Sequence, residues 1–554
     1  MTLYRYQLKS DILLLIIFLS FSNFVIAGSQ INSTTTSSST NNVGYGYQTL
    51  NAIEVGAGNN SAFGYQALTS NTTGDDNTGV GYQSLYSNTT GYDNNAFGRT
   101  SLYSNTTGYK NSAFGGNSLY SNTTGYKNTA FGDLSLRFNT TGYRNAAFGS
   151  GALENNTTGY RNAAIGNDAL GANTIGYYNT ATGDNSLAAN TTGSANTASG
   201  ALALSSNTTG SYNTANGLYA LSSNTIASNN TASGYSSLKL NTTGSYNTAY
   251  GNNSLYSMST GSSNTALGSN AMEWNTIGSR NVAIGDDALL GVSGNTTGSD
   301  NTAVGSRALY SNTTASYNTA VGTSSMQSNT TGAENVSVGY QSLYSNTTGY
   351  NNTATGKSSL YTNTTGYKNV AVGHKSLYSN TTGYKNDAFG NSTLYANTTG
   401  YKNAAFGHAS LKENTTGSEN TAMGTASLAS NTTGSLNTAI GESALNKITT
   451  GKFNTATGVA ALGYATTGSN NTIFGLAAGD TVNGDGNVFI GLLAGANDPT
   501  QENVISRSDK LYISSNSYTV DGDNSFTSMT ERNLITGDFS TGEMTLGNSG
   551  KIGR

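Results

Sequence analysis

The chain is 554 residues long, more than one ordinary globular domain, and it contains 70 glycines, one proline, no cysteine and only 9% charged residues. A net charge of −4 makes nucleic acid and anionic membrane surfaces unexpected partners, because both are bound through clustered positive charge. Without cysteine the chain has neither a disulfide framework nor a thiolate metal site.

Residues 1–27 have the pattern of a secretory signal peptide. Arg5 and Lys9 form a short basic region, an apolar run covers residues 12–19, and small residues follow at a cleavage point. The alternative is an uncleaved anchor, for which the apolar run is short. Cleavage predicts an exported chain without a transmembrane anchor, either secreted or held at a cell or virion surface. Residues 28–42, rich in Ser, Thr and Asn, are predicted to be a linker.

From Asn71 onward the chain repeats a 17-residue unit, in which we count Asn71 as position one. The unit begins 24 times up to Ala465, and one step is longer than the others, by three residues near Gly291–Gly294. Degenerate units precede Asn71, so the predicted repeat domain spans residues 43–499. A fixed period of this length is typical of a solenoid or a fibrous array.

Three positions of the repeat hardly vary and are predicted to be structural. Position seven is Asn and position eleven is Gly in all 24 units, and position fifteen is Leu in 21 of them. In the first four units these columns are Asn77, Gly81, Leu85, Asn94, Gly98, Leu102, Asn111, Gly115, Leu119, Asn128, Gly132 and Leu136. A Leu that returns once per coil stacks on itself as a core stripe. Gly suits corners with positive φ, and Asn suits a turn or a ladder between coils.

Each unit is predicted to contain two very short strands separated by turns. In the unit that begins at Asn122 these strands are Thr129–Phe131 and Ser135–Arg137. Position nine is Ala in 21 units, which indicates a close approach of another backbone, within the coil or between chains. Position ten ranges from Phe131 to Asn216, so we expect it to be mostly buried, with polar exceptions.

Such a coil buries little apolar surface. One Leu and one or two smaller residues contribute about 3–5 kcal/mol, while ordering each residue costs about 1–2 kcal/mol in backbone entropy. Ladders and stacks must supply much of the remainder, and a core shared by three chains would supply more. We therefore expect an all-β protein: a β-solenoid, trimeric rather than a single chain coiling alone, with residues 500–554 as a β-rich cap over the last coil.

The repeat resembles the YadA-type head repeats of trimeric adhesins over roughly residues 43–495. The resemblance rests on Asn281–Gly285 (Asn-Val-Ala-Ile-Gly) and its counterparts Asn301–Gly305 and Asn369–Gly373, each followed by a small residue and Leu. It implies a left-handed parallel β-roll formed by three chains, although a period of 17 is longer than that family's usual unit.

The end of the chain resembles tail-fibre and virion-spike proteins in which head-like repeats lead into a characteristic segment. The resembling stretches are Asn487–Gly491 (Asn-Val-Phe-Ile-Gly), Lys510–Ile513, and Gly537–Gly542 (Gly-Asp-Phe-Ser-Thr-Gly). This resemblance implies a fibre carried by a particle or a cell.

No catalytic site, cofactor or metal site is predicted, and we expect a non-enzymatic protein. His374 and His408 both occupy position twelve, two units apart, and are interpreted as tolerated surface residues because no third ligand converges on them. Asp485, Asp521 and Asp523 lie among glycines. Calcium could use such oxygens, but turns are their commoner use.

The triplet Asn-Thr-Thr occurs at the start of 18 units and matches the acceptor pattern for N-glycosylation. A glycan on every coil would crowd at the roughly 4.8 Å spacing of neighbouring strands. We therefore interpret these residues as ladder and turn residues.

Tyr recurs at position five and is often followed by Lys or Arg, which predicts a Tyr ladder beside a basic stripe. The expected ligand-facing residues are Tyr92, Tyr109, Lys110, Tyr126, Lys127, Tyr367, Lys368, Tyr384 and Lys385. Exposed aromatic side chains with polar neighbours suit contacts with a host-cell glycan or receptor. The alternative is that the rings only pack on one another and the Lys residues keep the edges soluble.

These patterns predict an exported fibrous surface protein, an adhesin or tail-fibre-like attachment protein that works through many weak contacts. The alternative is an ice-binding solenoid, because Thr columns such as those of Thr72 and Thr73 resemble the flat Thr arrays of some repeat antifreeze proteins. The Tyr and Lys residues at neighbouring positions count against ice binding.

Overall fold

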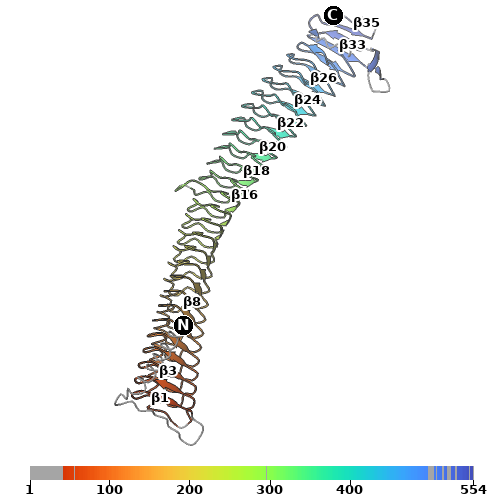
Figure 1. Ribbon diagram of the computed structural model, residues 1–554. Helices are drawn as coiled ribbons and strands as arrows, with labels where there is room; N and C mark the ends of the chain where they lie inside the picture. Colours follow the sequence, from red (N-terminus) through yellow and green to blue (C-terminus); the bar gives the residue numbers. More distant parts are fainter. Residues whose placement is uncertain are drawn as a thin grey trace, which may run out of the picture. The chain divides into compact units, whose positions relative to one another are not determined.

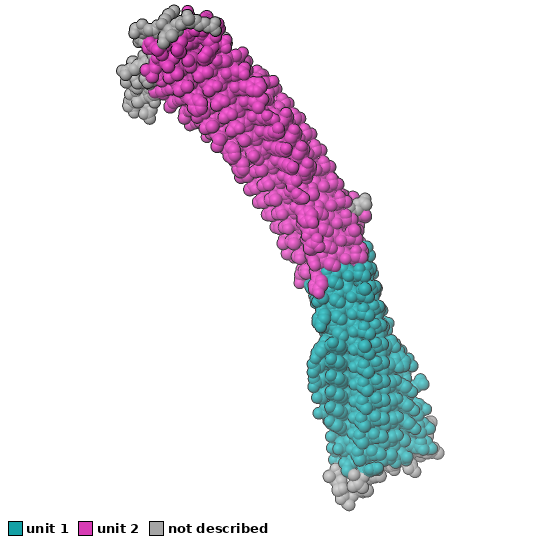
Figure 2. All heavy atoms as spheres, turned by 180° about the vertical axis from the view of Figure 1, so that it is seen from behind, with its two compact units in different colours: residues 1–245 teal, residues 246–554 magenta. Residues whose placement is uncertain are grey.

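The structure is a computed structural model that describes residues 41–54, 56–294, 296–496, 505–506, 508–514, 517–520, 526–530, 533–547 and 550–552. The predicted signal peptide and residues 28–40 of the predicted linker lie outside the described residues. The chain divides into two compact units, residues 1–245 (teal in Figure 2) and residues 246–554 (magenta). Within the described residues all regular structure is β, and no helix is long and apolar enough to span a membrane.

The described residues of the first unit form the short strands β1 (Val43–Tyr45), β2 (Ser61–Phe63), β3 (Thr78–Val80), β4 (Asn95–Phe97), β5 (Ser112–Phe114), β6 (Thr129–Phe131), β7 (Ala146–Phe148), β8 (Ala163–Ile165), β9 (Thr180–Thr182), β10 (Thr197–Ser199), β11 (Thr214–Asn216) and β12 (Thr231–Ser233).

The coils of the second unit carry the strands β13 (Thr248–Tyr250), β14 (Thr265–Leu267), β15 (Val282–Ile284), β16 (Thr302–Val304), β17 (Thr319–Val321), β18 (Val336–Val338), β19 (Thr353–Thr355), β20 (Val370–Val372), β21 (Asp387–Phe389), β22 (Ala404–Phe406), β23 (Thr421–Met423), β24 (Thr438–Ile440), β25 (Thr455–Thr457), β26 (Thr472–Phe474), β27 (Val482–Asn483) and β28 (Val488–Ile490). The last strands are β29 (Ile505–Ser506), β30 (Lys510–Ser514), β31 (Ser517–Val520), β32 (Phe526–Thr530), β33 (Asn533–Asp538), β34 (Glu543–Leu546) and β35 (Gly550–Ile552).

Each 17-residue coil contributes one strand, and within each unit the strand of one coil pairs in parallel with that of the next (Figure 1). The register advances by one repeat: Thr129 pairs with Ala146, and Phe131 pairs with Phe148. The predicted all-β, parallel solenoid is therefore confirmed. The longer step of the repeat is a loop, in which Val292 is exposed and its N–H donates to Thr296 Oγ1 at 2.8 Å.

The prediction of a second strand in each unit is wrong. Ser135–Arg137 forms turns, because the backbone alternates in sign: Leu134 has a φ of 62° and Leu136 a φ of 51°. The N–H of Leu134 donates to the preceding coil, at Gly116 O, and the N–H of Leu136 donates to the following coil, at Ala152 O, both at 3.0 Å. This segment thus stacks through backbone hydrogen bonds without strand geometry.

The core of a coil is thin and consists of small side chains around one Leu. Ala130 at position nine, Ser135 at position fourteen and Leu136 at position fifteen are all fully buried. The Ala side chains at position nine therefore point into their own coil. Of the two environments predicted for them, within the coil or between chains, the structure shows the first. Because side chains alternate across a strand, positions eight and ten must point outward. Phe131 is accordingly 39% exposed, and the prediction that position ten is mostly buried is wrong.

Two columns of buried Asn connect the coils. At position one, Asn397 Nδ2 donates to Oδ1 of Asn380 in the preceding coil at 2.8 Å, and to Gly400 O in its own coil at 3.0 Å. At position seven, Asn386 Nδ2 donates to Asn369 Oδ1 at 3.1 Å and to Gly400 O of the following coil at 2.8 Å. The carbonyl of Gly400 thus accepts a hydrogen bond from an Asn of each ladder. The polar half of the core is therefore hydrogen-bonded throughout each stretch of consecutive Asn residues.

Glycine is required at position eleven by both conformation and space. Gly132 has a φ of 135°, and a Cβ on it would lie 2.4 Å from Gly149 O of the next coil. That φ favours Gly strongly over any residue with a side chain. The column therefore sets how closely two coils approach at this corner.

Beyond β28 the parallel stack meets an antiparallel sheet. β30 pairs in parallel with β28 on one side and antiparallel with β33 on the other, and β34 and β35 follow as antiparallel neighbours. The buried ring of Phe489 meets Tyr512 edge to face at 5.3 Å. Across β30 and β33, Lys510 and Ser540 donate to Asp538 and hold the pKa of that carboxyl well below its usual range. The role of residues 500–554 as a cap stays a prediction.

The ladder at position one offers a matched pair of substitutions. Asn397→Ala removes a donor from Asn380 and an acceptor from Asn414, so two buried polar atoms lose partners. The ladder at position one stops at Asn431, because the next coil has Ile448 at that position. The Oδ1 of Asn431 is already buried without a partner. We expect Asn397→Ala to cost about 1–3 kcal/mol more than Asn431→Ala, measured by chemical unfolding followed by circular dichroism. Equal losses in the two variants would show that the ladder does not hold the coils together.

Candidate functional surfaces

Tyr rings form stacked columns on the outside of the coils. At position five the column runs through Tyr92, Tyr109, Tyr126, Tyr143, Tyr160 and Tyr177, with ring centroids 4.9 to 5.0 Å apart. In the second unit Tyr350, Tyr367, Tyr384 and Tyr401 repeat it at 4.9 to 5.0 Å. The rings of each pair are within 7° of parallel. Position five therefore places its predicted Tyr residues on one continuous surface in each unit.

A second pair of Tyr columns lies at position sixteen, which the sequence analysis did not single out. It comprises Tyr86, Tyr103 and Tyr120 in the first unit, and Tyr344, Tyr361, Tyr378 and Tyr395 in the second, with centroids 5.1 to 5.2 Å apart. Burial, and then the neighbouring Tyr residues, raise the pKa of Tyr103 and Tyr361 above the usual value. The recurrence of Tyr every 17 residues at this position was a signal that could have revealed it.

Stacking decides which part of each ring remains available. The flat faces of interior rings contact the rings above and below, so the columns present ring edges and hydroxyl groups to solvent. Tyr92, at the start of its column, is 41% exposed. Such a surface suits hydrogen bonding by the hydroxyl row more than stacking of a ligand on a ring face. Both interpretations given above, packing and ligand contact, are compatible with this geometry.

The basic residues that follow Tyr lie beside the columns. Lys110, Lys127, Lys368 and Lys385 share a φ of 55° to 56° at position six, which turns their side chains in the same direction in every coil. Lys110 Nζ lies 6.0 Å from the Tyr92 centroid. Lys402 Nζ lies 5.8 Å from the Tyr401 centroid and 2.9 Å from Glu419 Oε1. The stripe is thus basic along part of its length and is neutralised where an acidic residue follows.

The outward face of the strands is a third surface, and the sequence analysis missed it by assigning position ten to the core. Its apolar residues stack: Phe97, Phe114, Phe131 and Phe148 at 4.8, 4.3 and 5.4 Å, and Phe389 on Phe406 at 4.9 Å. Because side chains alternate within a strand, a residue at position ten must point away from the side that position nine faces. This alternation was the signal that could have exposed the error.

This strand face is almost free of charge. Among positions eight and ten of β1–β26 and β28, the single charged residue is Asp387. It lies in register between Val370 and Ala404, and burial raises the pKa of its carboxyl above the usual value. Charges of the described coils are instead placed on the turns, where the Tyr columns also lie.

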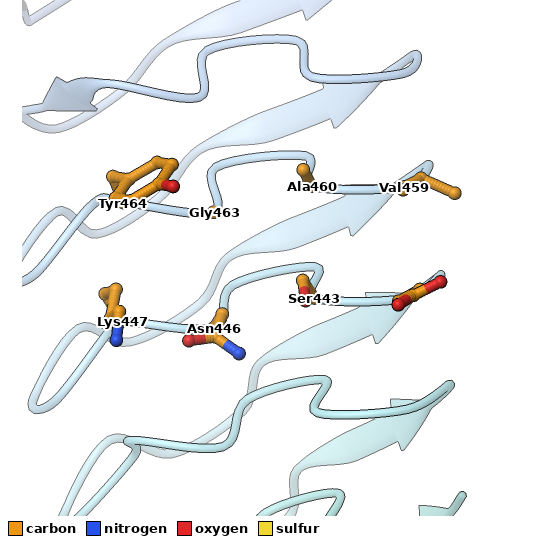
Figure 3. Close-up of a pocket in the computed structure, with 8 residues that line it drawn as sticks. Ser443, Asn446, Lys447, Val459, Ala460, Gly463 and Tyr464 are labelled. Carbon is orange, nitrogen blue, oxygen red and sulfur yellow. The ribbon is translucent and has the colours of Figure 1, made fainter. Parts of the chain in front are cut away.

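A groove of about 360 Å³ opens where small residues interrupt the turn columns (Figure 3). It is lined by Glu442, Ser443, Asn446 and Lys447 of one coil and by Val459, Ala460, Gly463 and Tyr464 of the next. Gly463 occupies position sixteen, where other coils carry Tyr, and this leaves the hollow. A Cβ on Gly463 would lie 2.6 Å from Oδ1 of Asp480 in the following coil.

Asp480 is a half-buried acid next to Gly463 of this groove. Its Oδ1 is buried without a hydrogen-bond partner. Burial raises the pKa of its carboxyl to about 6. The charged form of Asp480 is therefore disfavoured in the folded coil.

The residues considered for metal binding do not converge. No group of three or more His, Cys, Asp or Glu residues that could hold a metal ion occurs in the part of the chain that the structure describes. Asp485 instead accepts the N–H of Ser469 at 2.7 Å and so links two coils. Asp521 and Asp523 lie outside the described residues. His374 and His408 lie on turns of coils two repeats apart.

The Asn residues of the glycosylation triplets are fully buried wherever the structure describes them. Asn105, for example, uses its Nδ2 for bonds to Asn88 Oδ1 at 2.7 Å and Gly108 O at 2.9 Å. A glycan on that nitrogen would have to displace both bonds. The triplet is thus a ladder residue followed by Thr106, whose hydroxyl donates to Thr123 O at 3.1 Å, and by the exposed Thr107.

No protein-family model matches the chain, and no curated protein matches it in sequence.

The raised pKa of the half-buried Asp480 gives a pH-dependent prediction. Its carboxyl pKa is about 6 in the folded chain, against about 3.9 in an unfolded chain. The destabilisation of the folded chain by the charged Asp480 carboxylate is therefore absent below about pH 4 and reaches its full size above about pH 6. We expect Asp480→Asn to stabilise this part of the second unit by about 2 kcal/mol at neutral pH and to have little effect at about pH 4.

Urea unfolding at the two pH values measures this difference. The control is Asp184→Asn, which makes the same substitution at an exposed Asp of the first unit and leaves Asp480 in place. An equal effect of Asp480→Asn at both pH values would contradict the assignment.

Proposed function

We propose that this chain is a non-enzymatic, exported fibrous protein that acts as an adhesin or a tail-fibre-like attachment protein. The observation that carries the proposal is the repetition of identical outward hydroxyl rows, at about 5 Å, along the Tyr columns of each unit. A surface that presents the same weak contact many times gains affinity by multivalency. A glycan or receptor on a host cell is the ligand class that fits rows of Tyr hydroxyls beside Lys.

The proposal includes a homotrimer. The strand face is apolar over long stretches, and large exposed apolar surfaces mark interaction sites. A partner for this face must itself repeat once per coil, because the apolar column does so from β4 to β8 and from β14 to β18. Other copies of the same chain meet this requirement. The resemblance to adhesin head repeats favours three copies.

The strand face predicts which substitution disrupts the trimer. Phe131→Asp places a charge at position ten, and we expect it to weaken association, because a buried unpaired charge is costly. Tyr126→Asp places the same charge at position five of the same coil and should leave the trimer intact. Light scattering measures the mass in both cases. A folded monomer of the unmodified chain would refute the trimer.

The attachment function is tested by binding of the full chain to an array of immobilised glycans and to whole cells. In the triple variant Tyr109→Phe, Tyr126→Phe and Tyr143→Phe the rings can still stack, but three adjacent hydroxyls are lost. We expect binding to fall at least tenfold through reduced avidity, whereas Tyr212→Phe, outside the columns, should bind like the unmodified chain. Undiminished binding by the triple variant would contradict a role for the Tyr column.

Ice binding is the second candidate function, and one observation favours it. Thr73 is exposed, as are most of its Thr counterparts at position three, and these recur in stretches of successive coils. The neighbouring column is less suited, because the hydroxyl of Thr72 already donates to Thr89 O at 3.1 Å. Thermal hysteresis and faceted ice crystals in the presence of the protein would support this function, and their absence would remove it.

A further inference from the structure

The Tyr columns bring like atoms of consecutive coils close together. Tyr109, Tyr126 and Tyr143 have centroids 4.9 Å apart and ring planes within 6° of parallel. Because the rings are nearly parallel and follow the same backbone, each ring carbon next to a hydroxyl lies beside the same carbon of the next ring. The arrangement extends over six consecutive rings at position five of the first unit and over four in the second.

No thiol is available to join the coils of the chain covalently. It contains no cysteine anywhere in its 554 residues, so disulfides are excluded. The coils are held by hydrogen bonds, by a thin core and by ring stacking. The absence of thiols also matters for oxidation, because a thiol is a readily oxidised group that would compete with Tyr for an oxidant.

We propose that the Tyr columns are modification sites, at which oxidation joins Tyr residues of consecutive coils as dityrosine. The oxidant is hydrogen peroxide used by a haem peroxidase. Each of two neighbouring phenols loses one electron and one proton, and the two radicals then form a carbon–carbon bond between the ring carbons next to their hydroxyls. The two hydrogens lost from those carbons return to the phenol oxygens, and one peroxide is reduced to two water molecules.

The structure predicts which tyrosines react with one another. Tyr126 has a stacked Tyr partner on each side, 17 residues away in sequence. Tyr212 and Tyr317 are more accessible, at 67% and 62% exposed, but belong to no stacked pair among the described residues. Accessibility alone would favour these two, whereas pairing favours the columns. The Phe columns stack in the same way but carry no hydroxyl to oxidise.

The experiment treats the purified full chain with a haem peroxidase and hydrogen peroxide. Dityrosine fluorescence reports the reaction, and mass spectrometry of a digest identifies joined peptides, each pair two hydrogens lighter than the sum of its parts. Mixing isotopically heavy and light chains before assembly separates bonds within one chain from bonds between copies. We expect pairs such as Tyr109–Tyr126 within one chain, independent of protein concentration, and a higher thermal unfolding midpoint after the reaction.

Matched variants make the outcome decisive. The double variant Tyr109→Phe and Tyr143→Phe preserves ring shape but removes both phenol partners of Tyr126, so cross-links at Tyr126 should disappear. Tyr350→Phe with Tyr384→Phe makes the same test for Tyr367 in the second unit, should the first variant fail to fold. Cross-links that form equally at Tyr212 and Tyr317, or only between different chains, would overturn the proposal, as would a treated chain without dityrosine.

Discussion

The structure depends on one constraint: the backbone groups of a coil find their partners mainly in the coils before and after it. In the strand this is ordinary parallel pairing, but it also holds in the turns. Thr123 N–H, for example, donates to Thr140 O at 3.0 Å, and Leu136 N–H donates to Ala152 O at the same distance. Coils can satisfy each other only if their backbones superimpose, and this explains why the period of 17 residues is kept so strictly.

The same constraint allows a core that would be too thin for a globular protein. Each coil buries one Leu with a few small side chains, and Asn ladders fill the remaining interior with paired amides. A polar replacement is tolerated where it finds partners in this way. Ser337 stands where other coils have Ala, and its hydroxyl is bonded to Ser325 at 2.7 Å and to Ser342. Stability therefore rests on satisfied polar groups as much as on apolar burial.

Stacking also turns every surface position into a column. A side chain that recurs in consecutive coils meets its own kind at about 5 Å, so Tyr and Phe form ring stacks and Asn forms amide chains. Where the residue changes, the column ends and a local feature results. Gly463, at a position where several other coils carry Tyr, opens a groove beside the half-buried Asp480. The proposed functions all depend on this repetition of one side chain along consecutive coils.

The sequence by itself determined the fold class, because a period of 17 with one Leu per unit fits a stacked coil and no long helix. It also pointed to the Tyr column at position five and to Asn and Gly as residues that join and turn the coils. What it could not decide was the direction of each side chain. Alternation within a three-residue strand shows that positions nine and ten point to opposite sides, but not which of them faces the core, and the left-handed φ of Leu136 is unusual for a side chain of that kind. Only the tertiary structure placed Ala130 inside and Phe131 outside, since that choice depends on which backbone groups bond to the neighbouring coils.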